Sequence, residues 1–433
     1  MGLTRREFVL GLAGAGAVTA LGACRGGGER QADRPAPTTG AAAGGAGLGS
    51  GDGDGRLVVL TLYGGNDGLD TVVPAAASAY QSARGALARR PDEVLDLGDG
   101  LGLHPALGRL KGRWDDDSLA IVRGVGFGDL DRSHFHCMDV WQAGGDGHAT
   151  SGWLGRWLDA GRHDPLRALA VGTDLPLLLR GERRSGSLVP IGPLTVPGGS
   201  RLATLFGEMS RPGTGRPALG GAAAAAGADV LAVADAVGRA TAGTAADDDP
   251  VDGGGGAKAG GDAGGQEEKG KPKRGYGGLG AQLDLVAKLI EADLPTRVYA
   301  VSMGGFDTHS NERGTHDRLM ADLDAALGTF LDRMGDRPVT VLAYSEFGRR
   351  VEANASGGTD HGAAGPAFVC GPRVKGGFYG EEPSLTDLAD GDLRYNVDFR
   401  RLYSTVLNGV LGVDPDIALP DAKRHPPLPL LMA

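Results

Sequence analysis

The sequence predicts an α/β domain of three layers, in which helices cover both sides of a mostly parallel sheet. Short, continuously apolar runs recur along the chain, and amphipathic stretches of helical length lie between them. From Arg56 onward the chain of 433 residues is also long enough to bury a sizeable core. This alternation of two patterns is typical of buried strands with helices packed on either face.

Five apolar runs are predicted to be strands, at residues 57–63, 119–122, 298–302, 339–344 and 367–370. They are short and rich in aliphatic residues, as strands covered on both faces are. Helices are expected between and after them, at residues 133–142, 280–292, 317–334 and 398–411.

The N-terminus carries an export signal. Arg5 and Arg6 precede an apolar stretch that is diluted with Gly and Ala and is shorter than the roughly 20 apolar residues of a membrane-spanning helix. We expect residues 1–23 to be a twin-arginine signal peptide, recognised by the twin-arginine translocase. Small residues directly precede Cys24, as in a lipoprotein cleavage box, so Cys24 is predicted to carry a lipid anchor. The protein is then expected at the outer face of the cytoplasmic membrane. A chance cysteine in the signal is the alternative.

Composition divides the rest of the chain. Residues 24–55 are almost all Gly, Ala, Pro, Ser and charged residues, which predicts a flexible tether. Residues 56–413 form the predicted domain, interrupted at about 241–278 by a Gly-rich, charged stretch that is expected to be a disordered insertion. Residues 414–433 form a Pro-rich tail.

Charge and cysteine content exclude some functions. The formal net charge is −10, and there is no basic patch outside the signal and one short linker run, which argues against a nucleic-acid partner. Besides Cys24, the chain has Cys137 and Cys370, whose positions carry no spacing signature. We expect both to be ordinary buried thiols.

Ionisable residues follow three of the predicted strands directly. Asp67 comes after the first strand, Asp307 and His309 after the strand at 298–302, and Glu346 after the strand at 339–344. In open α/β sheets, ligands bind outside the carboxyl ends of the strands, so we expect these side chains to converge at one edge.

Three carboxylates and two imidazoles are candidate metal ligands. This set suits zinc, or manganese if the site is rich in oxygen, so a divalent metal is the expected cofactor. Each residue also has a structural alternative, since Asp67 could belong to a turn, Asp307 could cap a helix and Asp360 could brace a loop. The candidate ligands are Asp67, Asp307, His309, Asp360 and His361.

Ser133 is a candidate nucleophile because it begins a predicted helix, whose N-terminus favours an anion. The alternative is that Ser133 is only a helix cap. His134 and His136 could each be an acid, a ligand or a core contact, and a structural hydrogen bond is expected for His104. The other histidines are expected to be solvent-facing or local, namely His148, His163, His316 and His425.

Seven motifs occur in one order along the chain: GGNDGLDTVVP at 64–74, LHP at 103–105, RSHF at 132–135, SGWLGR at 151–156, GFDTH at 305–309, SEFGR at 345–349 and GTDHG at 358–362. In these motifs the chain resembles the exported bacterial family catalogued as domain of unknown function 1501, over nearly all of residues 56–413. The resemblance implies the fold of the alkaline phosphatase and sulfatase superfamily, whose members use divalent metals and a Ser, Thr or modified Cys nucleophile on phosphate or sulfate esters.

The resemblance also implies roles for single residues. Asp67 would be the metal ligand after the first strand, and Ser133 would be the nucleophile. Asp360 with His361 would form an adjacent ligand pair, while Asp307 and His309 would serve a second metal. The chain departs from the superfamily pattern in having one residue, not three, between Asp307 and His309. It also lacks a third downstream histidine unless His425 returns to the site, and Cys137 lacks the context of a formylglycine.

Two hypotheses follow. The first is a metal-dependent hydrolase of phosphate or sulfate esters, with His134 at the catalytic centre and Glu346, Arg349 and Arg132 orienting the substrate or the ligands. The second is a lipoprotein that keeps the fold without catalysis and binds envelope polymers or a second exported protein.

Overall fold

The structure is a computed structural model that describes residues 54–128, 131–145, 147–192, 194, 199–211, 213, 217–242 and 278–432. The predicted export signal at Arg5 and Arg6, the lipidated Cys24 and nearly all of the tether lie outside the described residues. The predicted insertion at 241–278 also lies outside them, except at its two ends.

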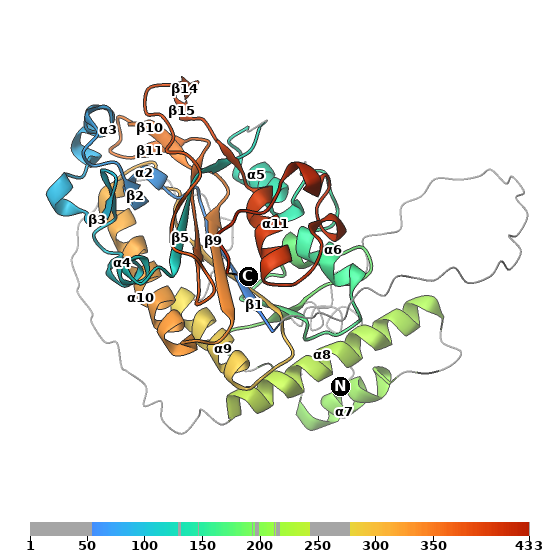
Figure 1. Cartoon of the computed structure of the whole chain (residues 1–433). Coiled ribbons are helices and arrows are strands. Elements are labelled where there is room, and N and C mark those ends of the chain that lie inside the picture. The colour runs from blue at the N-terminus through green and yellow to red at the C-terminus, as the bar shows by residue number, and fades with distance from the viewer. Residues whose placement is uncertain are drawn as a thin grey trace, which may run out of the picture. The chain divides into compact units, whose positions relative to one another are not determined.

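A nine-stranded sheet forms the centre of the main unit (Figure 1). Its order is β13-β5-β12-β9-β1-β8-β6-β7, and β16 pairs with β5. All five predicted strands are present, with β6, β7, β13 and β16 in addition. The bounds are β1 Arg56–Tyr63, β5 Leu119–Gly126, β6 Ala168–Val171, β7 Ser187–Val189, β8 Val298–Gly304, β9 Val339–Ser345, β12 Gly365–Cys370, β13 Gly377–Tyr379 and β16 Val397–Asp398.

The sheet is mostly parallel, as predicted. β1 pairs in parallel with β8 on one side and with β9 on the other, although its paired residues lie 241 positions before those of β8 and 283 positions before those of β9. β6 continues the parallel order beside β8, with β7 beyond it. β12 is the exception, because it runs antiparallel to both β5 and β9.

Helices cover both faces of the sheet, which gives the predicted three layers (Figure 1). Residues of β1 alternate between two cores, with Val58 and Leu60 in one and Leu57 and Val59 in the other. The first core includes residues of α4 (Gly108–Asp115), α9 (Leu279–Glu291) and α10 (Glu312–Met334). The second includes residues of α5 (His134–Ala143), α6 (Trp153–Ala160) and α11 (Arg400–Gly409).

Short elements lie between the main strands and helices. The sequence after β1 forms α2 (Gly68–Thr71), β2 (Val72–Val73) and α3 (Ser78–Arg84), and a small sheet joins β2, β3 (Leu95–Gly98) and β4 (Leu101–Leu103). After β9, the strands β10 (Arg349–Ala353) and β11 (Thr359–His361) form an antiparallel hairpin. A second short pair, β14 (Leu388–Ala389) and β15 (Asp392–Leu393), precedes β16.

The chain divides into two compact units. Among the described residues, one unit consists of α7 (Gly199–Met209) and the part of α8 (Ala218–Ala242) up to Leu231. Within this unit Gly227 allows a close approach, since a Cβ there would lie 2.2 Å from the Ser210 hydroxyl. Of the helices that the structure describes, α8 is long and apolar enough to cross a membrane by length and composition. The core helix of a soluble protein can pass the same test.

The Pro-rich tail packs on the main unit, where Leu428 and Leu430 are buried in the second core. His425 lies near Asp398, with Nδ1 3.5 Å from Oδ1. Cys137 and Cys370 are buried free thiols, as expected, and burial raises the pKa of both to about 12.

Candidate metal centre

The loops after three strands meet at the carboxyl edge of the sheet, and the predicted polar side chains come together there from β8 and β9 but not from β1. β1 leads into Gly64, β8 leads into Gly305 and Asp307, and β9 leads into Glu346. Gly64 has a φ of +118°, and a Cβ there would lie 2.5 Å from the backbone nitrogen of Asp307. Glycine is therefore required where the loops after β1 and β8 touch.

Three histidine side chains meet around Asp307, and we call His134, Asp307, His309 and His361 the ligand cluster. Oδ1 of Asp307 lies 3.1 Å from His361 Nε2, 3.1 Å from His309 Nε2 and 3.4 Å from His134 Nε2. The Nε2 atoms of His309 and His361 are 3.0 Å apart. A tetrahedral zinc site has neighbouring ligand atoms about 3.3 Å apart, given bonds of about 2.0–2.1 Å. The ligand atoms of His134, Asp307 and His361 all lie within 4.8 Å of one another, so these three residues could hold a single ion, with His309 beside them.

The Nδ1 atom of each imidazole in the ligand cluster lies next to an oxygen that can accept a hydrogen bond. Nδ1 of His134 lies 2.7 Å from Glu346 Oε1, that of His309 lies 3.3 Å from Asp360 Oδ1, and that of His361 lies 2.9 Å from the Arg132 carbonyl. With a proton on Nδ1, each Nε2 presents a lone pair to the cluster, which is how metal-bound histidines are oriented. Nε2 of His134 is buried without a hydrogen-bond partner, as a vacant ligand position would be.

Arg349 fixes the geometry of Asp307. Its buried guanidinium donates to Asp307 Oδ1 at 2.8 Å and to the carbonyls of Gly65, Phe306 and Thr359 at 2.7, 2.9 and 3.0 Å. Burial alone would raise the pKa of Asp307, but its contacts with Arg349 and His361 outweigh burial and lower the pKa to about 2. Asp307 is therefore anionic at neutral pH, and Arg349 is too deeply buried to bind a substrate.

Glu346 is buried and fully engaged. Its carboxylate accepts from the backbone nitrogen of Gly64 at 2.8 Å and from the Ser345 hydroxyl at 3.0 Å, besides contacting His134. The hydrogen bond between His134 and Glu346 raises the pKa of His134, although burial opposes this. Glu346 thus positions a ligand and does not reach into the cluster.

The backbone carbonyl of Arg132 contacts His361, and the backbone of Arg132 is in an unusual conformation. The φ of Arg132 is +59°, which is rare for a residue with a side chain and is maintained where surrounding contacts enforce it. The guanidinium of Arg132 donates to the buried Asp392 on β15 at 2.6 and 2.9 Å. Asp392 therefore acts on the ligand cluster indirectly, by fixing the carbonyl that orients His361. The sequence analysis did not identify it.

The structure does not bring Asp67 into the ligand cluster. Asp67 is buried, and both of its carboxylate oxygens are bound by Arg84 of α3. Its Oδ1 also accepts from the backbone nitrogen of Leu69, so it caps α2. The pKa of Asp67 is lowered because the contacts with Arg84 outweigh burial. Arg84 supplies the positive charge that a metal would otherwise provide.

Two further predicted residues lie beside the ligand cluster. Asp360 is exposed and contacts His309 Nδ1, so it lies behind a ligand and supports it. Ser133 directly precedes His134 and caps α5, because its Oγ accepts from the backbone nitrogen of His136 at 3.5 Å. The capping role does not exclude the nucleophilic one.

A second histidine cluster lies deeper, and we call Asp70, His104, His316 and Arg89 the buried cluster. His316 Nδ1 lies 2.9 Å from Asp70 Oδ2, and the Arg89 guanidinium donates to Asp70 at 2.9 Å. The same guanidinium lies 2.6 Å from His104 Nε2, and His104 Nδ1 accepts from the backbone of Ala106, which is the structural hydrogen bond expected. His316 is fully buried, so the expectation of a solvent-facing or local role was wrong.

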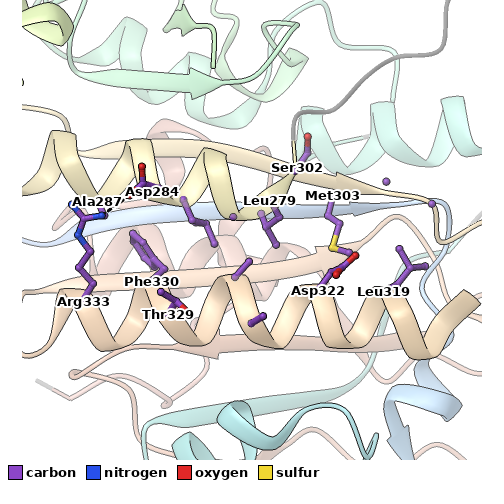
Figure 2. A pocket seen from close by; sticks show the side chains of 17 residues that line it. Leu279, Asp284, Ala287, Ser302, Met303, Leu319, Asp322, Thr329, Phe330 and Arg333 are labelled. Atoms are coloured by element: carbon purple, nitrogen blue, oxygen red, sulfur yellow. Dashed lines mark hydrogen bonds and ion pairs between the residues drawn. The ribbon is translucent and has the colours of Figure 1, made fainter. Parts of the chain in front are cut away.

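A cavity of about 870 Å³ lies away from these clusters, between α9, α10 and β8 (Figure 2). Leu279, Phe330 and Leu319 point into it, and Asp284 pairs with Arg333 at one end at 2.6 Å. It contains none of the predicted site residues.

Comparison with known proteins finds one family model that matches part of the chain and several weakly similar structures. The model of a family described as a protein of unknown function (DUF1501) matches residues 254–423, which is less than half of the chain. No curated protein matches. The C-terminal periplasmic domain of EcEptC from Escherichia coli, in complex with Zn, is 8% identical, with 86% of this chain and 88% of that chain covered and a TM-score of 0.41.

Two other solved structures are similar at the same level. Ps i-CgsB is 8% identical, with 86% of this chain and 77% of that chain covered and a TM-score of 0.40. A variant of TAB5 alkaline phosphatase with Mg bound is 12% identical, with 75% and 93% covered and a TM-score of 0.31. These similarities are weak, and no residue role is transferred from them.

Proposed function

We propose that this protein is a metal-dependent hydrolase of phosphate or sulfate esters that binds one divalent ion at the ligand cluster. The observation that supports the proposal is the convergence of three Nε2 atoms on one carboxylate oxygen, at 3.1 to 3.4 Å. The Nδ1 atom of each imidazole has its own acceptor, which is the supporting shell that a metal site requires.

The donor set favours zinc over manganese. Two imidazole nitrogens and one carboxylate oxygen, from His134, His361 and Asp307, suit a zinc ion whose fourth position is open to a substrate, whereas manganese prefers a site richer in oxygen. Asp67 and Asp360 do not add oxygens to the cluster, because Asp67 is bound by Arg84 and Asp360 lies behind His309.

When bound, the metal would supply Lewis-acid stabilisation to an ester oxygen. In this proposal Ser133 is the nucleophile, since it is next to His134 and lies at the N-terminus of a ten-residue helix, which stabilises an anion. The guanidiniums of Arg132 and Arg350 are partly exposed and share Asp392, so they are the candidates to orient an anionic substrate.

We also propose that the protein acts in the cell envelope, held at the membrane by a lipid on Cys24 after export of the folded chain by the twin-arginine translocase. The support is the sequence of the first 24 residues.

The proposal is tested by measuring metal content and turnover on the purified mature chain. One zinc per chain is expected, with release of phosphate or sulfate from aryl esters that is lost in Ser133→Ala while zinc is retained. A chain that takes up no metal and turns over neither ester would refute the proposal.

One observation favours the second candidate, a non-catalytic envelope protein that binds a polymer or a second exported protein. Arg84 and Arg89 neutralise Asp67 and Asp70, so the described residues form one open metal centre rather than two. Zinc binding with no turnover of any ester, and with no effect of Ser133→Ala, would support this candidate.

A further inference from the structure

A smaller cavity of about 290 Å³ lies at the same edge of the sheet as the ligand cluster. It is bounded by the carboxyl ends of β1, β6 and β8 and by α5, which is where open α/β sheets bind ligands. The polar residues that line it include Tyr63, Asp139, Gln142, Asp174, Arg180 and Ser302.

The cavity is connected to the ligand cluster by a short series of contacts. Tyr63, in the cavity wall, is followed by Gly64, whose backbone nitrogen donates to Glu346 Oε1 at 2.8 Å. The same oxygen lies 2.7 Å from His134 Nδ1. The backbone of Tyr63 is therefore within about 10 Å of the metal position, since bonds in the peptide and the imidazole add only a few ångströms to these contacts.

Helix α5 links the two sites along its length. It begins at His134, and Asp139 and Gln142, which lie five and eight residues later, line the cavity. At about 1.5 Å per residue they are roughly 7 and 12 Å along the helix from the metal ligand. A substrate with its ester at the ligand cluster could thus place a second group, about 10 Å away, in this cavity.

The lining favours a ligand that donates several hydrogen bonds. Asp139 and Asp174 are exposed carboxylates, which accept hydrogen bonds, and Ser302 adds a hydroxyl. The one guanidinium in the lining, that of Arg180, is turned back to donate to the carbonyl of Leu175, so it is not placed to attract a second anion.

Gln142 gives the cavity a fixed wall. Its Nε2 donates to the Tyr63 hydroxyl at 3.0 Å, and its Oε1 accepts from the backbone of Leu178 at 3.2 Å. Both ends of the amide are therefore held, so the positions of the groups around it are preorganised before a ligand binds.

We propose that this cavity binds the hydroxyl-rich part of the substrate, so that the substrate is a phosphate or sulfate ester of a sugar. The inference rests on the proposed function for the ester end of the molecule. In this proposal the ligand cluster binds the phosphate or sulfate group. The two carboxylates and the hydroxyls of the cavity accept hydrogen bonds from the hydroxyl groups of the sugar.

The test compares a sugar ester with an aryl ester on the zinc-loaded mature chain. For Asp139→Ala, KM for a hexose phosphate or sulfate is expected to rise at least tenfold more than KM for the matching 4-nitrophenyl ester, with little change in kcat. Asp322→Ala is the matched control, since Asp322 is an exposed carboxylate that lines the other cavity. It should leave both esters unaffected.

A binding measurement separates this inference from the proposed function. Saturation-transfer NMR with the free hexose and the zinc-free chain should show binding that Asp139→Ala weakens and Asp322→Ala does not. Sugar binding without turnover of any ester would refute the proposed hydrolase activity and would still support a sugar-binding site in this cavity. Equal effects of Asp139→Ala on sugar and aryl esters, or no sugar binding, would overturn the sugar site.

Discussion

The ligand cluster and the buried cluster use the same residue types in opposite ways. Both combine histidines with an aspartate, but the buried cluster contains Arg89, whose guanidinium already contacts Asp70, His104 and Asp317. In the ligand cluster the guanidinium of Arg349 donates to Asp307, and the three Nε2 atoms converge on the same carboxylate oxygen at 3.1 to 3.4 Å. The difference is that Arg89 contacts a ring nitrogen of a histidine in its cluster, whereas Arg349 contacts the carboxylate.

The largest expected effect is loss of the metal from the ligand cluster. His361→Ala removes one of the three residues whose ligand atoms lie close together, so we expect no zinc to be retained through dialysis and no turnover. Elemental analysis and an esterase assay measure this. His148→Ala, at an exposed histidine outside the cluster, should keep one zinc per chain. Equal metal content in the two variants would contradict the assignment.

Removing the buried cation Arg89 should lower the stability of the protein without changing the amount of zinc that it binds. Arg89→Ala leaves Asp70 buried and unpaired, so the free energy of unfolding should fall by about 3–5 kcal/mol, measured by urea denaturation. Zinc stoichiometry of the folded fraction should remain at one per chain. Arg90→Ala, at the exposed neighbouring arginine, should not change stability measurably. If Arg89→Ala instead binds a second zinc without loss of stability, the buried cluster can also bind metal, which would contradict the difference that we infer between the two clusters.

The buried cluster should also respond to acid. Burial, followed by the charge of Arg89, lowers the pKa of His104 to about 4 from its ordinary 6.5. A histidine whose pKa is depressed on folding stabilises the protein fully above pH 6.5, and this contribution is lost as the pH falls to about 4. The loss is at most about 3 kcal/mol for this shift. In His104→Gln the pH dependence of unfolding in this window should flatten, and an unchanged profile would exclude His104 as its source.

The smallest expected effect on zinc affinity comes from Asp392, which contacts His361 only through Arg132. Asp392→Ala frees Arg132 and so loosens the carbonyl that orients His361, which should weaken zinc affinity about 10- to 100-fold. Competition with a chelator measures this affinity. Asp387→Ala breaks an exposed pair with Arg394 near β14 and should not change zinc affinity. An equal loss in both variants would indicate general damage to this region and not positioning of His361.

The sequence predicted the five main strands, the parallel sheet and the edge where polar residues gather. These features depend on local patterns, namely continuous apolar runs and the polar residues directly after them. The short strands β6 and β7 were missed because their runs resemble any apolar segment of three or four residues. The reversed direction of β12 was missed because a strand's neighbours are set by residues far away in the chain.

Charge pairing was the part of the site that the sequence could not reveal. Asp67 looks like a ligand from its place after β1, but Arg84, seventeen residues later on α3, occupies both of its oxygens. From the sequence, His134 could be an acid, a ligand or a core contact, and the partner that orients its ring, Glu346 at Nδ1, lies 212 residues away. A spacing pattern contains no information about such partners.

The central position of β1 also has a consequence for folding kinetics. The first strand of the domain pairs with β8 and β9, so its neighbours are synthesised 241 and 283 residues after it. Contacts of such high sequence separation form slowly, because a long loop must close before they contribute. Asp307, His309 and His361 all come from the late part of the chain, and His134 meets them only when the sheet closes. The candidate metal centre is therefore among the last features to form, and we expect ion uptake to report the completion of folding rather than start it.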